Sequence, residues 1–196
     1  MPGVHTHDVI TFVTGAALAP LVYTGQMAAG AESSTAMVYS IIAVGAHLIS
    51  GIMFSPDLDL DSRIDNRWGI FFWIWRPYMW LIPHRHFWSH GLIVPPLLRL
   101  LYFYLVIVIF LSGGAWLLSL IGIIIPDYRI RFTDALISVA YDHPRETWWF
   151  LVGFAAGGAA HTVADWMVTG GKRYLRRMGF RITHDYSSHD GWRAHY

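Results

Sequence analysis

The run LIVPPLLRLLYFYLVIVIFLSGGAWLLSLIGIII, residues 92–125, decides the fold class of this chain because almost all of its 34 residues are apolar. Its main interruptions are Pro95-Pro96, Arg99 and Ser112-Gly113-Gly114. A helix needs about 20 residues to cross a bilayer core, so the run is too short for two crossings with a turn. We therefore expect one long or tilted helix that overshoots the bilayer. The alternative is a span that breaks at Ser112-Gly113-Gly114 and continues as a re-entrant segment covered by protein.

Three further apolar stretches predict membrane spans on either side of this run. They comprise residues 9–23, which could extend to residue 29, residues 37–54 and residues 148–168. Together with the long run they predict an all-α membrane protein with about four transmembrane helices. We expect a single polytopic domain over residues 1–177 and a polar tail over residues 178–196.

The composition agrees with a membrane class. The chain has 196 residues, of which 55% are hydrophobic and only 14% are charged, against about a quarter charged in soluble domains. The net charge of +1 gives no global basic field, so we expect no nucleic-acid partner. Cysteine is absent, which excludes disulfides and thiolate metal sites. The first eight residues lack a basic segment, so we expect no cleavable signal peptide.

Arginine and lysine predict the orientation of the spans. Basic residues are frequent in the loop 55–91 and after residue 171, whereas the loop 25–36 has none and the loop 126–146 has three. The positive-inside rule then places both termini and the loop 55–91 in the cytoplasm.

The segment RWGIFFWIWRPYMWLIP, residues 67–83, is crowded with aromatic side chains. It is too short to span a bilayer and contains two arginines and internal Pro77, which favour a position in the headgroup region. Its simplest interpretation is an interfacial anchor. The functional alternative is a lipid-facing entrance to a neighbouring site.

Histidine and aspartate gather where the predicted spans end. The four clusters are His5-Thr6-His7-Asp8, Pro56-Asp57-Leu58-Asp59, His84-Arg85-His86-Phe87-Trp88-Ser89-His90 and His161-x-x-x-Asp165. Imidazole and carboxylate groups are costly in hydrocarbon, so their presence there indicates function. The predicted topology brings all four clusters to the cytoplasmic end, where they would form a metal site.

The spacing of these residues suits metal binding. His161 and Asp165 lie one helical turn apart on one face and can hold one ion together. The full set offers nitrogen and oxygen donors in excess of what one structural zinc needs, which predicts two or more divalent ions. Zinc fits best, and manganese, magnesium or iron would also suit the carboxylates. Arg85 has the planar fork that matches a phosphate group.

Each feature also has a structural interpretation. The pair His161 and Asp165 could be a hydrogen-bonded structural pair, and the aspartates after Pro56 could be a solvated loop or a helix cap. His47 lies in mid-span with no partner at its depth, so we expect a helix–helix hydrogen bond. Gly153-x-x-x-Gly157 predicts close helix packing.

The ordered motifs resemble a known family over nearly the whole chain, to about Arg177. They are His7-Asp8, Ser55-Pro56-Asp57-Leu58-Asp59, Arg67-Trp68-Gly69, His84-Arg85 with Ser89-His90, and His161-x-x-x-Asp165-Trp166. The chain resembles an uncharacterised integral-membrane "metal-binding protein" family of photosynthetic bacteria, which is similar to the membrane-bound predicted metal-dependent hydrolases. The broader group has His-Arg-x-x-Thr-His, where this chain has one more residue and Ser89. The resemblance implies a bacterial inner or thylakoid membrane location. Zinc-dependent phospholipase C is a looser analogy.

Two functions of different classes follow. The first is a metal-dependent hydrolase of a phosphoester or another amphiphile at the cytoplasmic membrane surface, with membrane lipids as partners. Its metal ligands would be His7, Asp8, Asp57, Asp59, His90, His161 and Asp165, with His84 as ligand or proton shuttle and Arg85 stabilising developing charge. The second is a non-catalytic metal-containing subunit or assembly factor of a larger membrane complex, with a membrane-protein partner. A transporter is disfavoured because the polar residues cluster at one end of the spans.

Overall fold

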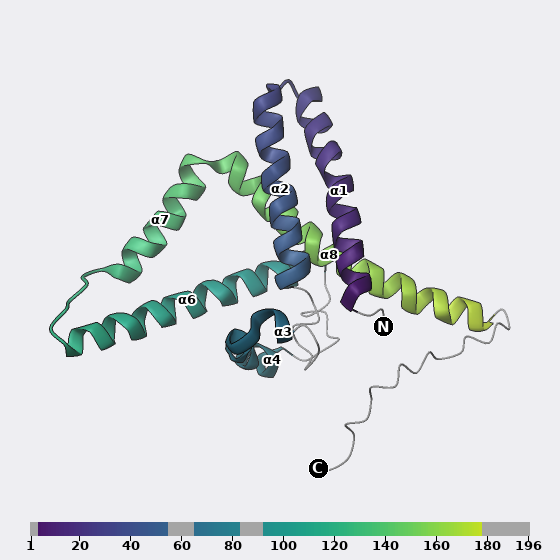
Figure 1. Cartoon of the computed structure of the whole chain (residues 1–196). Coiled ribbons are helices and arrows are strands. Elements are labelled where there is room, and N and C mark those ends of the chain that lie inside the picture. The colour runs from purple at the N-terminus through teal and green to yellow at the C-terminus, as the bar shows by residue number, and fades with distance from the viewer. Residues whose placement is uncertain (1–3, 55–64, 83–91, 178–196) are drawn as a thin grey trace, which may run out of the picture.

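The computed structural model describes residues 4–54, 65–82 and 92–177, and over these ranges the chain is helical with no strand. Figure 1 shows the arrangement. The helices are α1 (Val4–Ala28), α2 (Ser33–Met53), α3 (Asp65–Trp68), the 3-10 helix η2 (Gly69–Trp75), α4 (Arg76–Leu81), α6 (Val94–Leu120), α7 (Tyr128–Asp142) and α8 (Pro144–Arg177). The all-α class predicted from the sequence is confirmed for these residues.

Helices α1 and α2 form an antiparallel hairpin (Figure 1). Gly30 makes the turn between them with a φ of 85°, a left-handed conformation that favours glycine, and its N–H donates to the carbonyl of Met27. The start of α1 and the end of α2 consequently lie at the same end of the hairpin.

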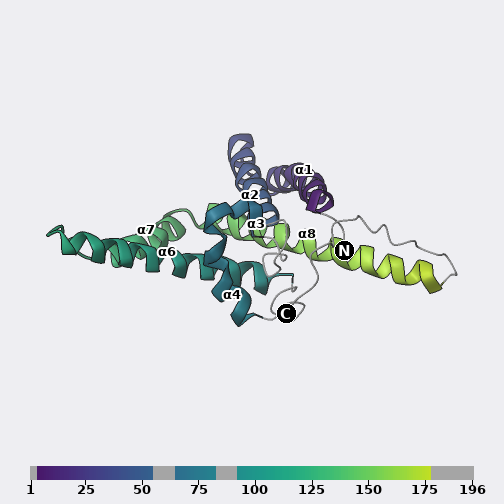
Figure 2. The ribbon, with the colours of Figure 1, turned by 60° about the horizontal axis from the view of Figure 1, so that its bottom comes forward.

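Helices α6 and α8 run across the hairpin instead of alongside it, as Figures 1 and 2 both show. The fold is therefore no up-and-down bundle of parallel spans. Helix α8 contacts both members of the hairpin as well as α6 and α7. The start of α1, the end of α2, the start of α6 and the middle of α8 meet at one junction.

Small residues allow α8 to approach α2 closely. A Cβ atom on Gly153 would collide with the backbone of Ala43, and one on Gly157 would collide with the carbonyl oxygen of His47. The predicted packing role of Gly153 and Gly157 is confirmed.

The aromatic segment is fixed to the junction by one of its faces. Trp75 and Tyr78 are buried in a core cluster with Phe54, which directly follows α2, and Phe154 of α8. The ring of Trp75 lies edge-on to that of Phe54, with centroids 5.5 Å apart. Other side chains of the segment are exposed, among them Ile70, Phe71, Trp73 and Trp80.

Three described helical stretches are long and apolar enough to cross a membrane: Thr6–Ala28, Ser33–Met53 and Val94–Leu120. Helix α6 continues through Ser112-Gly113-Gly114, which confirms the single long helix and excludes the break at that position. At 27 residues it is about 40 Å long. Helix α8 is not among the three, so the fourth span stays a prediction.

One predicted loop contains a helix. Residues 126–146 were expected to connect two spans, and α7 occupies most of that stretch. It contains no buried residue, and its 15 residues are fewer than a membrane span requires.

Candidate metal centre

Two buried imidazole rings meet at the helix junction. His7 lies in the first turn of α1 and is 5% exposed, and His161 lies in the middle of α8 and is 1% exposed. The rings are stacked, with centroids 3.7 Å apart and planes inclined by 13°. Helix packing therefore brings together two of the predicted ligands from the first and last helices.

Apart from Asp8, one of the other predicted site residues lies on a described helix and five do not lie in the described ranges. Asp165 lies on α8 one turn beyond His161. Asp57, Asp59, His84, Arg85 and His90 fall outside the described residues. Within the ranges that are described, no three His, Cys, Asp or Glu side chains form a group that could hold a metal ion.

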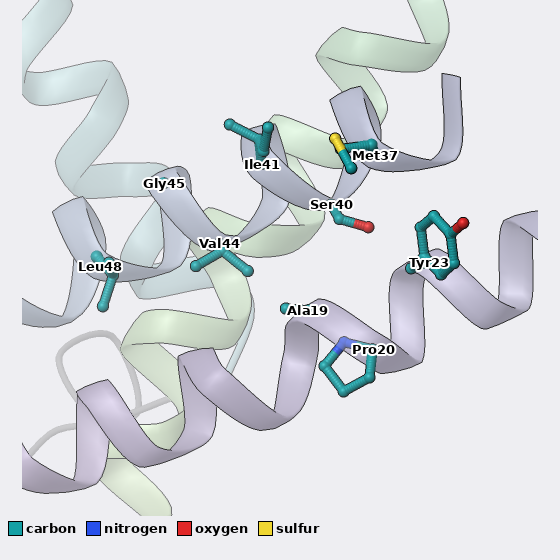
Figure 3. A pocket seen from close by; sticks show the side chains of 9 residues that line it. All are labelled: Ala19, Pro20, Tyr23, Met37, Ser40, Ile41, Val44, Gly45 and Leu48. Atoms are coloured by element: carbon teal, nitrogen blue, oxygen red, sulfur yellow. The ribbon is translucent and has the colours of Figure 1, made fainter. Parts of the chain in front are cut away.

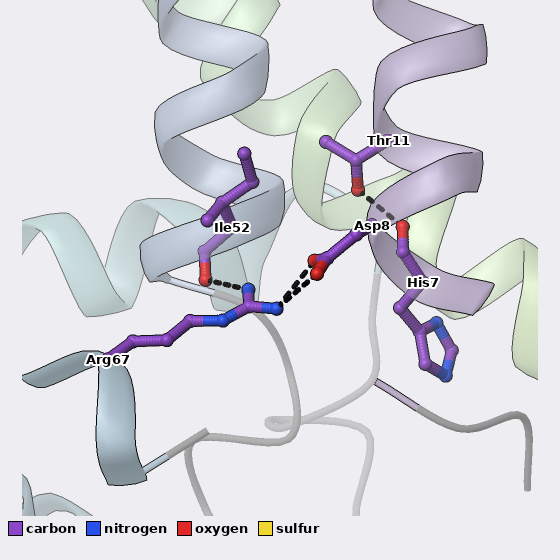
Figure 4. Close-up of polar contacts among 5 residues, drawn as sticks. All are labelled: His7, Asp8, Thr11, Ile52 and Arg67. Carbon is purple, nitrogen blue, oxygen red and sulfur yellow. Dashed lines mark hydrogen bonds and ion pairs between the residues drawn. The ribbon is translucent and has the colours of Figure 1, made fainter. Parts of the chain in front are cut away.

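Asp8 is engaged by an arginine. Both carboxylate oxygens of Asp8 accept hydrogen bonds of 2.6 Å from Nη2 of Arg67, while Nη1 of Arg67 donates to the carbonyl oxygen of Ile52 at 2.7 Å (Figure 4). The guanidinium group thus connects α1 to the carboxyl end of α2. Thr11 donates to the carbonyl of His7 at 2.9 Å within the same part of α1.

The carboxyl end of α2 receives side-chain donors at three successive carbonyls. Arg67 donates to Ile52, Trp68 Nε1 donates to Met53 at 2.9 Å, and Arg99 donates to Phe54 at 3.1 Å. The last carbonyls of a helix have no partner within the helix, and burial makes an unpaired carbonyl costly. These donors therefore fix the backbone that leads directly into the motif Ser55-Pro56-Asp57-Leu58-Asp59.

Sequence reasoning missed the structural roles of Arg67 and Arg99. In the sequence, Arg67 counts toward the orientation of the spans and belongs to the motif Arg67-Trp68-Gly69, whereas Arg99 is an interruption of the long apolar run. Arg99 is 1% exposed. An ionisable residue at the start of an apolar helix was a signal that could have identified it, because such residues are costly unless they have partners.

His47 makes the helix–helix contact expected from the sequence. Its Nε2 lies 2.9 Å from Thr14 Oγ1 and 3.1 Å from the carbonyl oxygen of Thr11, both on α1. Thr14 Oγ1 lies 2.7 Å from the carbonyl of Ile10, to which it donates its hydrogen. We therefore assign the proton of His47 to Nε2, which donates across the hairpin. The structural interpretation of His47 is confirmed.

An apolar groove of about 680 Å³ lies between α1 and α2 (Figure 3). Its lining includes Pro20, Tyr23, Met37, Val44 and Leu48, and contains no imidazole or carboxylate. This groove is therefore separate from the candidate metal centre.

The chemistry of the stacked pair suits a divalent ion that accepts nitrogen ligands. Imidazole binds such ions as a neutral ligand through a nitrogen lone pair in the ring plane. Because the two rings of His7 and His161 lie in nearly parallel planes, an ion shared by both requires one ring to rotate.

The family comparison agrees with this chemistry. The family model described as "Uncharacterized metal-binding protein (DUF2227)" matches residues 2–175. Neither a curated protein nor a solved structure matches the chain.

Proposed function

The chain belongs to this family of uncharacterised metal-binding proteins, and on that premise we propose that it is a membrane metalloenzyme. Its proposed activity is metal-dependent hydrolysis of a phosphoester or another amphiphilic substrate at the cytoplasmic membrane surface. The observation that carries the proposal is the contact between buried His7 and His161.

The proposed ligands extend this pair with residues of the other sequence motifs. They are His7, Asp57, Asp59, His90, His161 and Asp165, holding two or more divalent ions, with zinc favoured over manganese, magnesium or iron. Support comes from α2, whose end is fixed at the junction two residues before Pro56.

A bound divalent ion would supply the activation of water at neutral pH. The chain would supply the remaining groups. His7 and His161 bind as neutral imidazoles and, being buried, exclude bulk water from their side of the site. Arg85 binds an anionic oxygen of the substrate, and His84 carries a proton or acts as a further ligand.

A membrane location is proposed from the three apolar helices and the exposed face of the aromatic segment. Trp80 of α4 is 85% exposed and Ile70 of η2 is 82% exposed, although Trp75 and Tyr78 of the same aromatic segment are buried in the core. Tryptophan is enriched where bilayer meets water, so this face suits contact with lipids. We propose a multi-pass protein of the bacterial inner or thylakoid membrane, with cytoplasmic termini.

Metal analysis and hydrolysis assays test the proposal together. The detergent-purified protein should contain at least one equivalent of a divalent metal, and Asp165→Ala should lower that content. The metal-loaded protein should hydrolyse a phosphoester, and Asp57→Ala or a chelator should abolish turnover. Arg85→Ala should weaken turnover and leave the metal content unchanged. A metal-free wild-type protein that cannot be loaded would contradict the proposal.

A second candidate is a non-catalytic subunit or assembly factor of a membrane complex. The exposed apolar side chains of α6 and α7 favour it, because they suit lateral contact with another membrane protein. The two functions differ in whether the metal has a coordination position that an added small ligand can occupy: a catalytic metal has one, and a structural metal does not. A loaded protein whose metal binds no added azide or cyanide, and which is inert toward phosphoesters, would favour the structural role.

A further inference from the structure

Asp8 and His7 are neighbours on α1 but contact different elements. The carboxylate of Asp8 bonds to Arg67 of α3, whereas the ring of His7 stacks on His161 of α8. Successive residues of an α-helix are rotated by about 100°, so fixing the direction of one side chain fixes that of the next. The contact at Asp8 therefore determines how α1 presents His7.

Arg67 is suited to this task because its guanidinium group reaches two helices at once. One terminal nitrogen binds α1 through Asp8, and the other binds the carbonyl of Ile52 in α2. The positive charge also complements the negative carboxyl end of the α2 dipole. The side chains of Arg67 and Asp8 are only 19% and 29% exposed, so water competes weakly for the contact.

We infer that Asp8 and Arg67 form a positioning pair that holds His7 against His161, and that Asp8 is not a metal ligand. The inference rests on the proposed metal site. It assigns Asp8 a different role from that of Asp57, Asp59 and Asp165, although the sequence groups all four as candidate ligands.

A mutant cycle on the whole chain in detergent tests the pair, with Co²⁺ as the probe ion. Asp8→Ala and Arg67→Ala should each weaken Co²⁺ binding by about tenfold or more, the usual cost of losing a group that orients a ligand. The double variant should be no weaker than either single variant, because both substitutions break one link. Asp8→Asn should restore affinity, since its amide oxygen still accepts from Arg67.

The visible absorption of bound Co²⁺ separates positioning from ligation. Loss of a ligand changes the coordination sphere and hence the spectrum, so the Asp8 variants should retain the wild-type spectrum once saturated. A changed spectrum in Asp8→Asn, or additive losses in the double variant, would overturn the inference and make Asp8 a ligand.

Two controls keep the test independent of the metal site. Arg76→Ala removes an exposed arginine of the same segment and should leave Co²⁺ affinity unchanged.

Because the chain has no cysteine, spin labels can be placed at exposed Val9 of α1 and Ile49 of α2. Their distance distribution should broaden in Arg67→Ala. If the wild type binds no Co²⁺, the proposed function fails, whereas an unchanged distribution and affinity in Arg67→Ala overturns the positioning pair alone.

Discussion

The ring of His7 lies flat against the ring of His161, with 3.7 Å between their centroids, although one residue belongs to the first helix and the other to the last. Both rings are buried at the helix junction. The contact therefore depends on how α1 and α8 pack at the junction.

Removal of either stacked ring should abolish or severely weaken metal binding. We expect His7→Ala and His161→Ala each to lower the metal content of the purified protein by more than half, as measured by elemental analysis. The matched control is His143→Ala, which removes an exposed histidine beyond the end of α7 and should retain the wild-type content. Equal metal content in all three variants would remove this pair from the site.

Metal binding should separate the stacked rings. A shared ion requires one ring to turn, so the ring-current shift that each imidazole imposes on the other should be lost. Proton NMR of the protein with labelled histidine should show His7 and His161 ring signals moving on addition of Zn²⁺, while those of His47 stay in place. Unmoved signals at saturating Zn²⁺ would show that the rings do not bind the ion together.

The contact between α2 and α8 should not tolerate a methyl group at Gly157. The added Cβ would collide with the carbonyl of His47 and lie 2.9 Å from Ser50 Cβ, so Gly157→Ala should lower the free energy of unfolding by about 1–3 kcal/mol. Gly114→Ala on α6 is the control, since a Cβ there meets nothing within 4 Å. Denaturant unfolding in detergent, followed by tryptophan fluorescence, measures both. Comparable stability of the two variants would refute the close approach.

His47 should matter for stability and not for metal binding. His47→Ala removes the hydrogen bonds across the hairpin, so it should lower the free energy of unfolding by about 1–2 kcal/mol. The metal content should remain that of the wild type. Metal loss from a His47→Ala protein that is still folded would instead connect this histidine to the site.

Cysteine accessibility tests the four-span topology. Single cysteines at Ala31, Tyr141 and Ser188 should be labelled from the periplasmic, periplasmic and cytoplasmic sides respectively, because the positive-inside rule places the termini inside. The chain has no native cysteine to interfere. Labelling of Ser188 from the same side as Tyr141 would leave three crossings and place α8 along the membrane.

Local features of the fold were predictable because they depend on nearby residues. Hydropathy located α1, α2 and α6, and the spacing of Gly153 and Gly157 indicated a packing face. The crosswise position of α6 and α8 was not predictable, since hydropathy gives no relative orientation of helices. Packing of particular side chains determines it, as where Phe103 of α6 and Phe154 of α8 both lie edge-on to Phe54.

The candidate site was also predictable only in part, because residue types can be read from the sequence and contacts between distant residues cannot. The sequence indicated His7 and His161 as candidate ligands by their residue type. Their contact depends on the tertiary fold. It could not separate Asp8 from other candidate aspartates, because the partner that distinguishes Asp8 lies 59 residues away at Arg67. The roles of Asp57 and Asp59 stay predictions.

The side-chain donors at the end of α2 imply an order of biosynthesis. The carbonyls of Ile52, Met53 and Phe54 are translated before the residues that bind them, and Arg99 emerges only with α6. Chains emerge from the ribosome amino terminus first, so the carboxyl end of α2 is made before any of the side chains that donate to it. The imidazole stack follows later still, when His161 has been made. A chain that ends before α8 therefore lacks the contact between His7 and His161.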